Sequence, residues 1–461
     1  MFPDDKIAEI RERADIVEVI SEYVSLKKAG INYKGVCPFH ADSDPSFNVN
    51  PARYFYHCFG CGVSGDVFSF LQNIEGIDFM EAAKRLALKY GIQLPEKQMD
   101  SKQKALQDRE KTEKQRRLYI LEMATIFFEE QLQSQDAQVA RDALQKRKIS
   151  EKSVKDFRMG FAPDSWDKLL NHLKKNRVSE NEALSLGLIK PRKSGDGFYD
   201  AFRNRLMFTI TDSQGHPIAF SGRALCDDDN AKYINSPETR EYTKGKVLFG
   251  LYQARVEMSK QKEAVLVEGN FDVVAMHDAG FKNVVAPLGT AFTVEQASLL
   301  KRRVDKVTVM FDGDRAGIKA AFRAFPIIAG NGLAGYMVKL PEKEDPDSFL
   351  RNFGSETLEK SLSEAKGLLD EIIIMTASAT DGSSQDISRR VKKLHPLINS
   401  LKDSMERDLY IQKTASAFRI DPSLVFKYLK EQPQKEVFKE LNSGIAPLPG
   451  YADERELLGL L

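Results

Sequence analysis

Three of the four cysteines in this chain lie near one histidine, in two pairs with the same internal spacing. "CPFH" carries Cys37 and His40, and "CFGC" carries Cys58 and Cys61. Two residues between ligands let both side chains of a tight turn face one ion, and two such turns complete a tetrahedron. Because thiolate and imidazole suit Zn²⁺, the pattern predicts one structural zinc ion. Unrelated buried thiols would require two matched pairs by coincidence in a cysteine-poor chain.

Aromatic and basic residues surround the cysteine pairs. Aromatic faces interleaved with cations suit single-stranded nucleic acid, through base stacking and phosphate contact. Alternation along a strand also predicts that the aromatics on one face form the core of this small module. Cys226 has no such neighbours, and we expect it to be a small buried hydrophobe. The residues around the pairs are Lys34, Arg53, Tyr54, Phe55, Tyr56 and Phe59.

Carboxylates follow three strand-like runs, "VLVEG", "VMFDGD" and "VKLPEKEDPD". In open α/β sheets ligands bind beyond the carboxyl ends of the strands, so these acids are expected at one rim. Grouped carboxylates raise each other's pKa values, and a pair of divalent cations, Mg²⁺ or Mn²⁺, would relieve the repulsion and suit phosphoryl chemistry. Asp and Gly are also common turn residues, so one such motif alone is weak evidence. The predicted ligands are Glu268, Asp272, Asp312, Asp314, Asp345 and Asp347.

Cations precede the acidic motifs. "FRNRLMF" carries Arg203 and Arg205, which are expected on one face of a strand because they are two residues apart. Arginine can grip phosphate oxygens with two hydrogen bonds, and lysine adds a point charge. Lys246 is interpreted as an ordinary solvated residue. The predicted phosphate-binding residues are Arg203, Arg205, Arg223, Lys232 and Lys244.

The elements that position these residues follow from the periodicity of the sequence. Residues 4–28 show the three- and four-residue steps of a helix. Residues 118–250 are mixed, and from 263 to 345 short β-branched runs alternate with helical segments, which predicts a parallel sheet with right-handed crossovers. Residues 355–431 are again helical. The charged run 95–117 is typical of a solvated helix or a flexible tether.

Composition limits the class of protein. The chain has 461 residues, 42% hydrophobic and 29% charged, so two to four packed domains are expected. Lys and Arg number 68 and Asp and Glu 67, so nucleic-acid binding depends on how charge is distributed. The few cysteines, the absence of a signal-peptide pattern and the lack of a long apolar run predict a cytoplasmic protein with no membrane partner.

The order of these motifs resembles the bacterial replicative DNA primase family over nearly the whole chain. The glutamate followed by an Asp-x-Asp pair is the signature of the Toprim fold, which primases share with topoisomerases and some nucleases. The zinc motif and "KYINSPET" make the resemblance specific. The motifs that carry it are "CPFH…CFGCG", "FRNRLMFTITDSQGHPIAFSGR", "KYINSPET", "VEGNFD", "LGT", "FDGDRAG" and "EDPD".

The resemblance implies a multidomain α/β and α+β protein. It implies an N-terminal zinc ribbon, a central mixed α/β subdomain joined to a Toprim parallel-sheet subdomain, and a C-terminal helical segment. The expected boundaries are 1–100 for the zinc-binding domain, 101–117 for the charged linker, 118–256 for the N-terminal subdomain of the RNA polymerase domain, 257–345 for Toprim, 346–431 for the helical subdomain, and 432–461 for a linker and possible start of a helicase-binding domain.

The resemblance also implies the activity and its residues. A monomer would synthesise short RNA primers on single-stranded DNA from ribonucleoside triphosphates. Glu268, Asp312 and Asp314 would be the principal catalytic metal ligands, supported by Asp272, Asp345 and Asp347. The basic residues Arg203, Arg205, Arg223, Lys232 and Lys244 would hold the incoming nucleotide and the template–primer.

Helicase binding is treated separately. Family members normally continue into a C-terminal helical domain that docks onto the replicative helicase. Here the chain stops at "DERELLGLL", which resembles the first helix of that domain. We therefore expect a truncated or short form and do not assume helicase binding.

Two rival interpretations stay open. A Toprim nuclease or topoisomerase would cleave or relax DNA without incorporating nucleotides, the latter with one of the 14 tyrosines as nucleophile. A non-catalytic, zinc-dependent DNA-binding protein would bind DNA without Glu268 and Asp312. A fusion of primase and helicase is disfavoured because no G-x-x-x-x-G-K-[ST] loop occurs.

Overall fold

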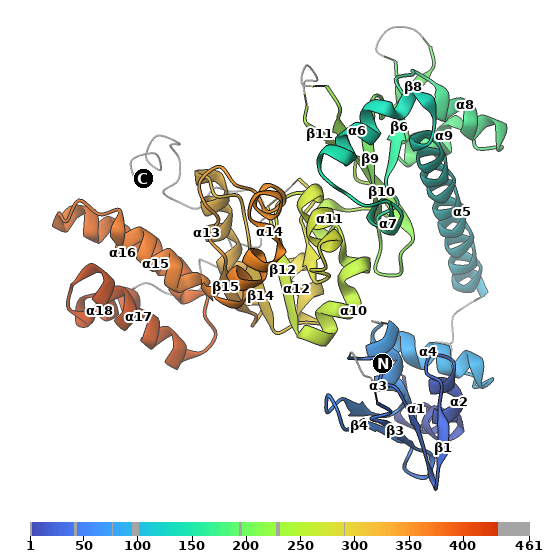
Figure 1. Cartoon of the computed structure of the whole chain (residues 1–461), viewed down its shortest axis with the longest axis horizontal. Coiled ribbons are helices and arrows are strands. Elements are labelled where there is room, and N and C mark those ends of the chain that lie inside the picture. The colour runs from blue at the N-terminus through green and yellow to red at the C-terminus, as the bar shows by residue number, and fades with distance from the viewer. Residues whose placement is uncertain are drawn as a thin grey trace. The chain divides into compact units, whose positions relative to one another are not determined.

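The protein folds into two compact units, Met1–Glu113 with Arg255–Lys260, and Lys114–Ala254 with Gln261–Leu461 (Figure 1). None of the helices that the structure describes is both long and apolar enough to cross a bilayer. The computed structural model describes residues 2–40, 44–75, 77–94, 101–192, 196–226, 231–289 and 291–431.

The first unit is built on a five-stranded antiparallel sheet in the order β1-β2-β3-β4-β5. Strand β3 (Phe47–Asn50) pairs with β4 (Phe55–Cys58), and alternation buries Phe47, Val49 and Tyr56 on one face. The rings of Phe47 and Tyr56 stack with their centroids 5.1 Å apart. The other strands are β1 (Lys27–Ala29), β2 (Asn32–Gly35) and β5 (Ser64–Gly65).

Four helices pack with this sheet around one core. The prediction of one helix over residues 4–28 was wrong, because two helices form and the strand β1 follows them. Asp15 separates the two helices, since its carboxylate accepts hydrogen bonds from the N–H groups of Val17 (2.8 Å) and Glu18 (3.2 Å) and so begins a new helix. The helices are α1 (Asp4–Arg13), α2 (Ile16–Ser21), α3 (Val67–Glu75) and α4 (Phe79–Lys89).

The long helix α5 (Ser101–Leu132) contains most of the charged run. Residues 95–100 lie outside the described residues, and from Ser101 onward the run is helical rather than a tether. The same helix continues past the expected boundary at residue 117 and buries Ile120, Leu121 and Phe128. The exposed residues 109–112 and the buried Ile120 therefore belong to one helix.

The second unit begins with a four-stranded antiparallel sheet in the order β11-β10-β9-β6. Its two long central strands, β9 (Arg205–Thr211) and β10 (Pro217–Ala224), are buried over most of their length. The edge strands are β6 (Gly160–Ala162) and β11 (Tyr233–Asn235), and β7 (Ile189–Pro191) pairs with β8 (Phe198–Asp200) in a separate hairpin. The helices here are α6 (Gln138–Lys146), α7 (Glu151–Asp156), α8 (Lys168–Lys175), α9 (Glu180–Ser185) and α10 (Leu251–Gln261).

A second, largely parallel sheet follows in the order β13-β12-β14-β15-β16. The four strands predicted between residues 263 and 345 are confirmed as parallel neighbours, and β16 (Lys366–Gly367) adds an antiparallel edge. The parallel strands are β12 (Glu263–Leu266), β13 (Val284–Val285), β14 (Lys306–Val309) and β15 (Ala334–Met337), and the helices are α11 (Asn270–Asp278), α12 (Val294–Lys301), α13 (Arg315–Gly330) and α14 (Pro346–Ser363).

The strand order reverses between β12 and β14. The chain runs from β12 to β13 on one side and then returns past β12 to β14 on the other. Accordingly α11 packs with α14, whereas α12 packs with α13. In open α/β sheets the crevice beyond the carboxyl ends of two such strands is the usual ligand site. Glu268 and Asp312 follow β12 and β14 in the sequence, so they lie beyond the carboxyl ends of these two strands.

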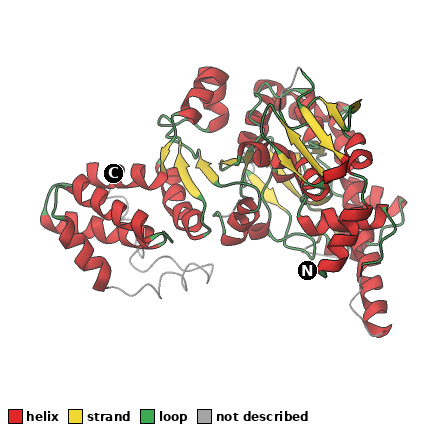
Figure 2. Cartoon of the chain, turned by 90° about the horizontal axis from the view of Figure 1, so that it is seen from below, coloured by secondary structure: helices red, strands yellow, loops and turns green. Residues whose placement is uncertain are grey.

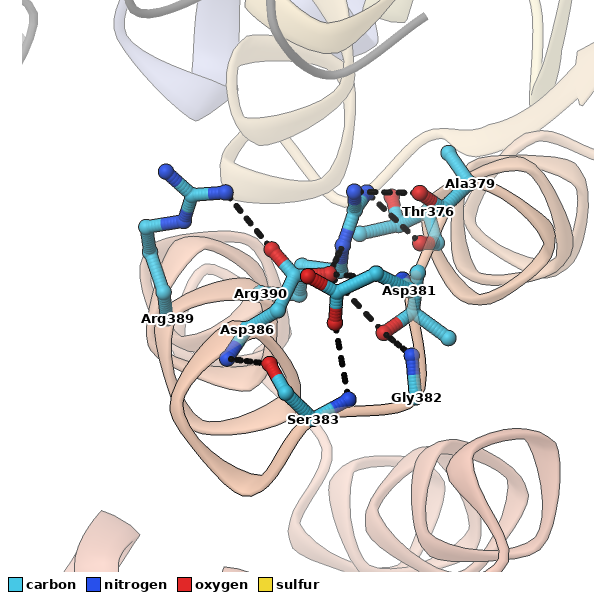
Figure 3. A network of polar contacts seen from close by, with 9 residues as sticks. Thr376, Ala379, Asp381, Gly382, Ser383, Asp386, Arg389 and Arg390 are labelled. Atoms are coloured by element: carbon cyan, nitrogen blue, oxygen red, sulfur yellow. Dashed lines mark hydrogen bonds and ion pairs between the residues drawn. The ribbon is translucent and has the colours of Figure 1, made fainter.

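The last described part of the chain is helical, as predicted (Figure 2). Asp386 and Arg390 form a buried ion pair on helix α16 (Ser384–Asn399), and Arg390 also donates to two carbonyls at the end of helix α15 (Leu368–Ser378). Figure 3 shows this network. The expected linker at residues 432–461 lies outside the described residues. The helices that follow α16 are α17 (Ser404–Phe418) and α18 (Pro422–Glu431).

Candidate metal sites and nucleic-acid interface

The four predicted zinc ligands converge in the first unit. Cys37, His40, Cys58 and Cys61 offer ligand atoms that all lie within 4.8 Å of one another. The sulfur atoms of Cys37 and Cys61 are 3.9 Å apart, and the Sγ of Cys58 lies 3.8 Å from Nδ1 of His40. Ligands around a tetrahedral zinc ion with Zn–S bonds of about 2.3 Å are separated by about 3.8 Å. The donor set and its spacing therefore fit one zinc ion.

Backbone groups support the thiolates. The N–H groups of Gly60 and Cys61 donate to the sulfur of Cys58 at 3.3 and 3.5 Å. Although burial opposes the effect, these hydrogen bonds and one from Ser46 lower the pKa of Cys58 to about 7. Gly60 is also required for space, since a Cβ there would lie 2.6 Å from Nε2 of His40.

The aromatics near the zinc site divide between core and surface. Tyr56 is fully buried, whereas Tyr54, Phe55 and Phe59 are 43%, 40% and 74% exposed. The structure therefore leaves three of these four aromatic side chains accessible. Cys226, which we expected to be buried, is exposed instead, because its segment follows β10 rather than lying within it.

Glu268 and Asp312 meet at the crevice between β12 and β14. The Oε1 atom of Glu268 accepts a hydrogen bond from the backbone N–H of Asp312 at 3.2 Å. Burial, followed by the charges of Asp312 and Asp314, raises the pKa of Glu268 to about 7. Burial and the charges of Asp345 and Asp314 raise the pKa of Asp312 to about 6. These acids are close enough to repel one another in a partly dry site.

Asp272 ties two loops of the rim together. It is 6% exposed, and its two oxygens accept hydrogen bonds from the N–H groups of Gly269 (3.0 Å) and Asp347 (3.3 Å). Burial and the charges of Asp345 and Asp312 raise the pKa of Asp272 well above its usual range. The first bond caps α11 just after Glu268, and the second holds the start of α14.

The other three predicted acids differ in their surroundings. Asp314 and Asp345 begin α13 and α14, and each accepts a hydrogen bond from a backbone N–H in the first turn of its helix. Asp347 is 1% exposed and pairs through Oδ2 with Arg147 and with Arg351, the latter at 2.5 Å. Asp347 is therefore placed to hold α14 to its neighbours rather than to face solvent.

The donor chemistry of the rim fits hard divalent cations, since every candidate ligand is a carboxylate. Of the residues that the structure describes, only the Cys/His group forms a compact set of three or more ligands. The rim acids raise one another's pKa values without closing into such a set. A bound cation would relieve this mutual repulsion.

Cations line the side of the rim formed by the antiparallel sheet. Lys232 is exposed, and its charge partly offsets the rise in the pKa of Asp312. The guanidinium of Arg223 donates to the hydroxyl of Tyr233 at 2.8 Å and lies 4.8 Å from the ring of Phe271. Arg147 lies 4.3 Å from the same ring. Two arginines thus lie against the same aromatic side chain of α11.

The prediction that Arg203 and Arg205 lie on one face of a strand was wrong. Asn204 between them has a φ of 48°, which turns the chain before β9 begins and breaks the alternation. Arg205 is 2% exposed and donates to the carbonyls of Gly222 (3.1 Å) and Ala231 (3.0 Å). Its guanidinium therefore supports β10 and the segment that leads into β11.

Arg203 instead takes part in an exposed stack on the surface. Its guanidinium lies 3.4 Å from the ring centroid of Trp166, which is 53% exposed. Tyr199 packs edge-on to Trp166 at 5.5 Å, and Arg192 lies 5.9 Å from the same ring. Together Trp166, Arg203, Tyr199 and Arg192 form what we call the Trp166 platform.

Lys244 lies on a short 3₁₀ turn (Lys244–Lys246) that helix α12 holds in place. The side chain of Gln296 donates to the carbonyl of Lys244 at 3.1 Å, and the hydroxyl of Thr293 donates to the carbonyl of Gly245 at 2.5 Å. Lys246 is exposed, in agreement with its interpretation as a solvated residue.

Sequence reasoning missed two parts of this site. Arg147 follows α6 in an ordinary charged stretch, and nothing local indicates that it reaches Phe271 and Asp347. Trp166 offered a weak signal, because it is the single tryptophan of the chain and lies in the polar segment "PDSWDK". Its stacking partners come from separate segments, which only folding brings together.

Four family models match the chain. They are described as CHC2 zinc finger (residues 2–102), DNA primase catalytic core, N-terminal domain (127–255), Toprim-like (265–350) and DnaB-helicase binding domain of primase (388–423). The last match falls on α16 and α17 and the start of α18, whereas we had expected any helicase-docking segment only after residue 432.

Curated relatives and solved structures agree with these matches. The chain is 38% identical to the DNA primase of Halalkalibacterium halodurans, covering 95% of this chain and 72% of that protein, and 37% identical to that of Aquifex aeolicus, covering 94% and 83%. A crystal structure of the zinc-binding and RNA polymerase domains of Aquifex aeolicus primase matches with a TM-score of 0.59 and 34% identity, covering 92% of this chain and 99% of that one. A DnaG primase catalytic domain bound to single-stranded DNA matches with a TM-score of 0.60 and 32% identity, covering 68% and 98%. The chain therefore belongs to the bacterial DNA primase family.

Proposed function

We propose that this DNA primase joins ribonucleotides at the acidic rim by two-metal nucleotidyl transfer, with Mg²⁺ or Mn²⁺ as the cation. The observation that carries the proposal is the pairing of Glu268 with Asp312 across the β12–β14 crevice, where both pKa values are raised. Two bound cations would activate the attacking 3′-hydroxyl and stabilise the leaving pyrophosphate.

The acids have different roles in this proposal. Glu268, Asp312 and Asp314 hold the cations, and Asp345 adds a fourth carboxylate at the rim. Asp272 is a positioning residue, because both of its oxygens accept backbone hydrogen bonds that fix the loops around it. Asp347 is a second positioning residue, because two arginines occupy its Oδ2 atom.

Basic residues hold the triphosphate. Lys232 is exposed and acts electrostatically on Asp312, so it can offer its charge to phosphate oxygens beside the cations. Arg223 and Lys244 complete this group from β10 and from the turn held by α12. Arg205 supports the same strands from within, and its role is to position them.

The Trp166 platform binds the single-stranded template. An exposed tryptophan with arginines against its ring offers a stacking surface for bases and charge for phosphates. Replacing Trp166 by alanine should weaken single-stranded DNA binding, since stacking contributes about 1–3 kcal/mol per base. Unchanged affinity in a fluorescence-anisotropy titration would remove the platform from the template path, and Trp166→Phe should retain most of the binding.

The zinc module contacts the template as well. Its exposed Tyr54, Phe55 and Phe59 offer a second set of aromatic faces, with Arg53 and Lys34 in the same hairpins. We assign this module to selection of the initiation site. Substitution of Phe59 should therefore alter where primers start more than how fast nucleotides are joined.

One experiment tests the reaction itself. Purified protein is given single-stranded DNA, labelled ribonucleoside triphosphates and Mg²⁺, and the products are resolved by size. Short RNA that depends on template and on divalent cation supports the proposal. DNA cleavage or supercoil relaxation without RNA would support a nuclease or topoisomerase instead, and metal-independent DNA binding with no product would support a non-catalytic protein.

A helicase is the proposed protein partner, and the family-model match over residues 388–423 supports it. Met405 and Leu409 on α17 are 73% and 49% exposed and lie one turn apart on the same face. Charged substitutions at these two positions should weaken co-purification with a DnaB-type helicase while primer synthesis by the isolated protein continues. Equal co-purification of wild type and variant would exclude this face.

A further inference from the structure

A row of cations lies on the outer face of α13, the helix that begins directly after Asp314. Arg315, Lys319 and Arg323 are four residues apart, so they share one side of the helix. Arg315 and Arg323 are exposed and Lys319 is half-buried. At 1.5 Å per residue the row is about 12 Å long. We call these three residues the α13 stripe.

The helix is anchored by its opposite side. Ala321, Ala324, Phe325 and Ile328 are buried there, and α13 packs against α12, β15, α15 and α16. The stripe therefore does not contribute to this packing. It presents a fixed line of positive charge that starts at the acidic rim.

The stripe has no structural partner that would explain it. No hydrogen bond or ion pair joins Arg315, Lys319 or Arg323 to any other residue that the structure describes, whereas Arg147, Arg158 and Arg390 are paired with carboxylates. Arg315 also lies in the first turn of the helix, where the helix dipole disfavours a cation. Arg315 therefore does not stabilise its end of the helix, and the three cations are available to an external anion.

The type of anion follows from what the stripe lacks. Phe325 of α13 is buried, and Phe322, which lies on the same side of the helix as Arg315, is half-buried, so neither ring is exposed as Trp166 is. Surfaces for single strands combine cations with exposed rings on which bases stack, as at the Trp166 platform. A line of cations without an exposed ring offers its contacts mainly to phosphates, which suits a duplex whose bases are already paired.

We propose that the α13 stripe binds the sugar-phosphate backbone of the RNA–DNA duplex as it leaves the acidic rim. This inference rests on the proposed function, because only primer synthesis produces such a duplex beside Asp314. The stripe holds the growing product against the enzyme while further nucleotides are added. Its contacts are electrostatic and independent of sequence.

The test is hybrid binding by the intact protein without added divalent metal, so that the acidic rim does not contribute. The variant is Arg315→Gln, Lys319→Gln, Arg323→Gln, which retains good helix formers. The matched control replaces three exposed lysines outside the site, Lys152→Gln, Lys155→Gln, Lys175→Gln. Each protein is titrated into a preformed RNA–DNA hybrid and into single-stranded DNA over a range of salt concentrations.

For the hybrid, the slope of log affinity against log salt should fall in magnitude by about two to three units, because each lost phosphate contact accounts for about 0.9. Binding of single-stranded DNA and all binding by the control should stay at wild-type values. In primer synthesis the stripe variant should release more dinucleotide and less full-length product. Hybrid binding with an unchanged slope would overturn the inference.

Failure of the inference is distinguishable from failure of the proposed function. If wild-type protein makes primers and the stripe variant binds the hybrid normally, only the stripe assignment fails. If wild-type protein makes no RNA, the proposed function fails, and the hybrid titration still decides whether the stripe binds a duplex.

Discussion

Glu268 and Asp312 show how the fold changes the pKa values of two ordinary carboxylates. Each follows a buried parallel strand, and the strands are direct neighbours. Burial and mutual repulsion raise the pKa of Glu268 to about 7 and that of Asp312 to about 6. Ionising both side chains in this partly buried position costs free energy, and a bound cation would offset that cost. The pair therefore suits metal binding.

Replacing Asp312 by alanine should abolish dinucleotide formation and leave the fold intact, because its side chain serves the rim rather than the core. The assay is the primer-synthesis experiment above, with circular dichroism as a check of folding. Asp305→Ala is a matched control, since Asp305 precedes the same strand at its other end and its side chain is 74% exposed. Full dinucleotide synthesis by the Asp312 variant would refute the two-metal assignment.

The raised pKa values predict a pH-dependent response to Mg²⁺. Ligating carboxylates must lose their protons, so Mg²⁺ should raise the melting temperature more at pH 8 than at pH 6. Without metal, the folded protein binds more protons at Glu268 and Asp312 than the unfolded chain, so their contribution to stability falls as pH rises from 3.8 to about 7. Thermal unfolding at both pH values, with and without Mg²⁺, measures these effects.

Glu268→Gln is the control for this prediction. The amide cannot ionise, so the response to Mg²⁺ should shrink and lose most of its dependence on pH. An equal Mg²⁺-induced shift in wild type and variant would place the cation elsewhere.

At the scale of elements, the joint between α15 and α16 depends on one buried ion pair. The guanidinium of Arg390 binds Asp386 and also donates to the carbonyls of Thr376 (3.1 Å) and Ala379 (Figure 3). Asp386 further accepts from the hydroxyl of Thr380 at 2.8 Å. These hydrogen bonds hold the pKa of Asp386 well below its usual range. Arg390 thereby donates hydrogen bonds to carbonyls at the end of α15 that have no partner within that helix.

Asp386→Asn should destabilise the protein by about 3–5 kcal/mol, because it leaves Arg390 buried without its counter-charge. Denaturant unfolding measures the loss. Arg389→Gln should cost less than about 1 kcal/mol, since Arg389 contacts the same carboxylate but is 49% exposed. Similar losses in both variants would mean that burial does not decide the importance of this pair.

At the scale of the whole molecule, the two units depend on different forces. The second unit packs around two apolar clusters, whereas the first has one cluster, which includes Cys37 and Cys58 of the Cys/His site. Zinc binding of about 10–16 kcal/mol in small modules is effectively folding energy. Metal should therefore matter far more to the stability of the first unit than to that of the second.

Removing zinc with a strong chelator should unfold the first unit and leave the second folded. Differential scanning calorimetry should show two transitions in the zinc-loaded protein, only one of which disappears on chelation. Cys58→Ser should have the same effect, whereas Cys226→Ser should have none, because Cys226 lies outside the zinc site. A chelated protein that keeps both transitions would contradict the coupling of zinc to folding.

The sequence alone predicted the features that depend on residues close together in the chain. Matched Cys/His spacing predicted the zinc ligands, and alternating β-branched and helical runs predicted a parallel sheet with acids at its carboxyl edge. Strand ends and tight turns are set by neighbouring residues, so their chemistry can be read directly. One helix was predicted over residues 4–28 because apolar spacing alone does not show where Asp15 begins a new helix.

Only the tertiary structure decided which side chains share a site when they come from distant segments. Arg147 reaches Asp347, Arg203 turns away from Arg205 to lie on Trp166, and the cations of α13 remain without partners among the described residues. Such outcomes depend on long-range packing. Residues from distant segments decide whether a guanidinium is paired with a carboxylate, buried, or left exposed to solvent. The spacing of residues along the sequence does not predict which of these surroundings a guanidinium will have.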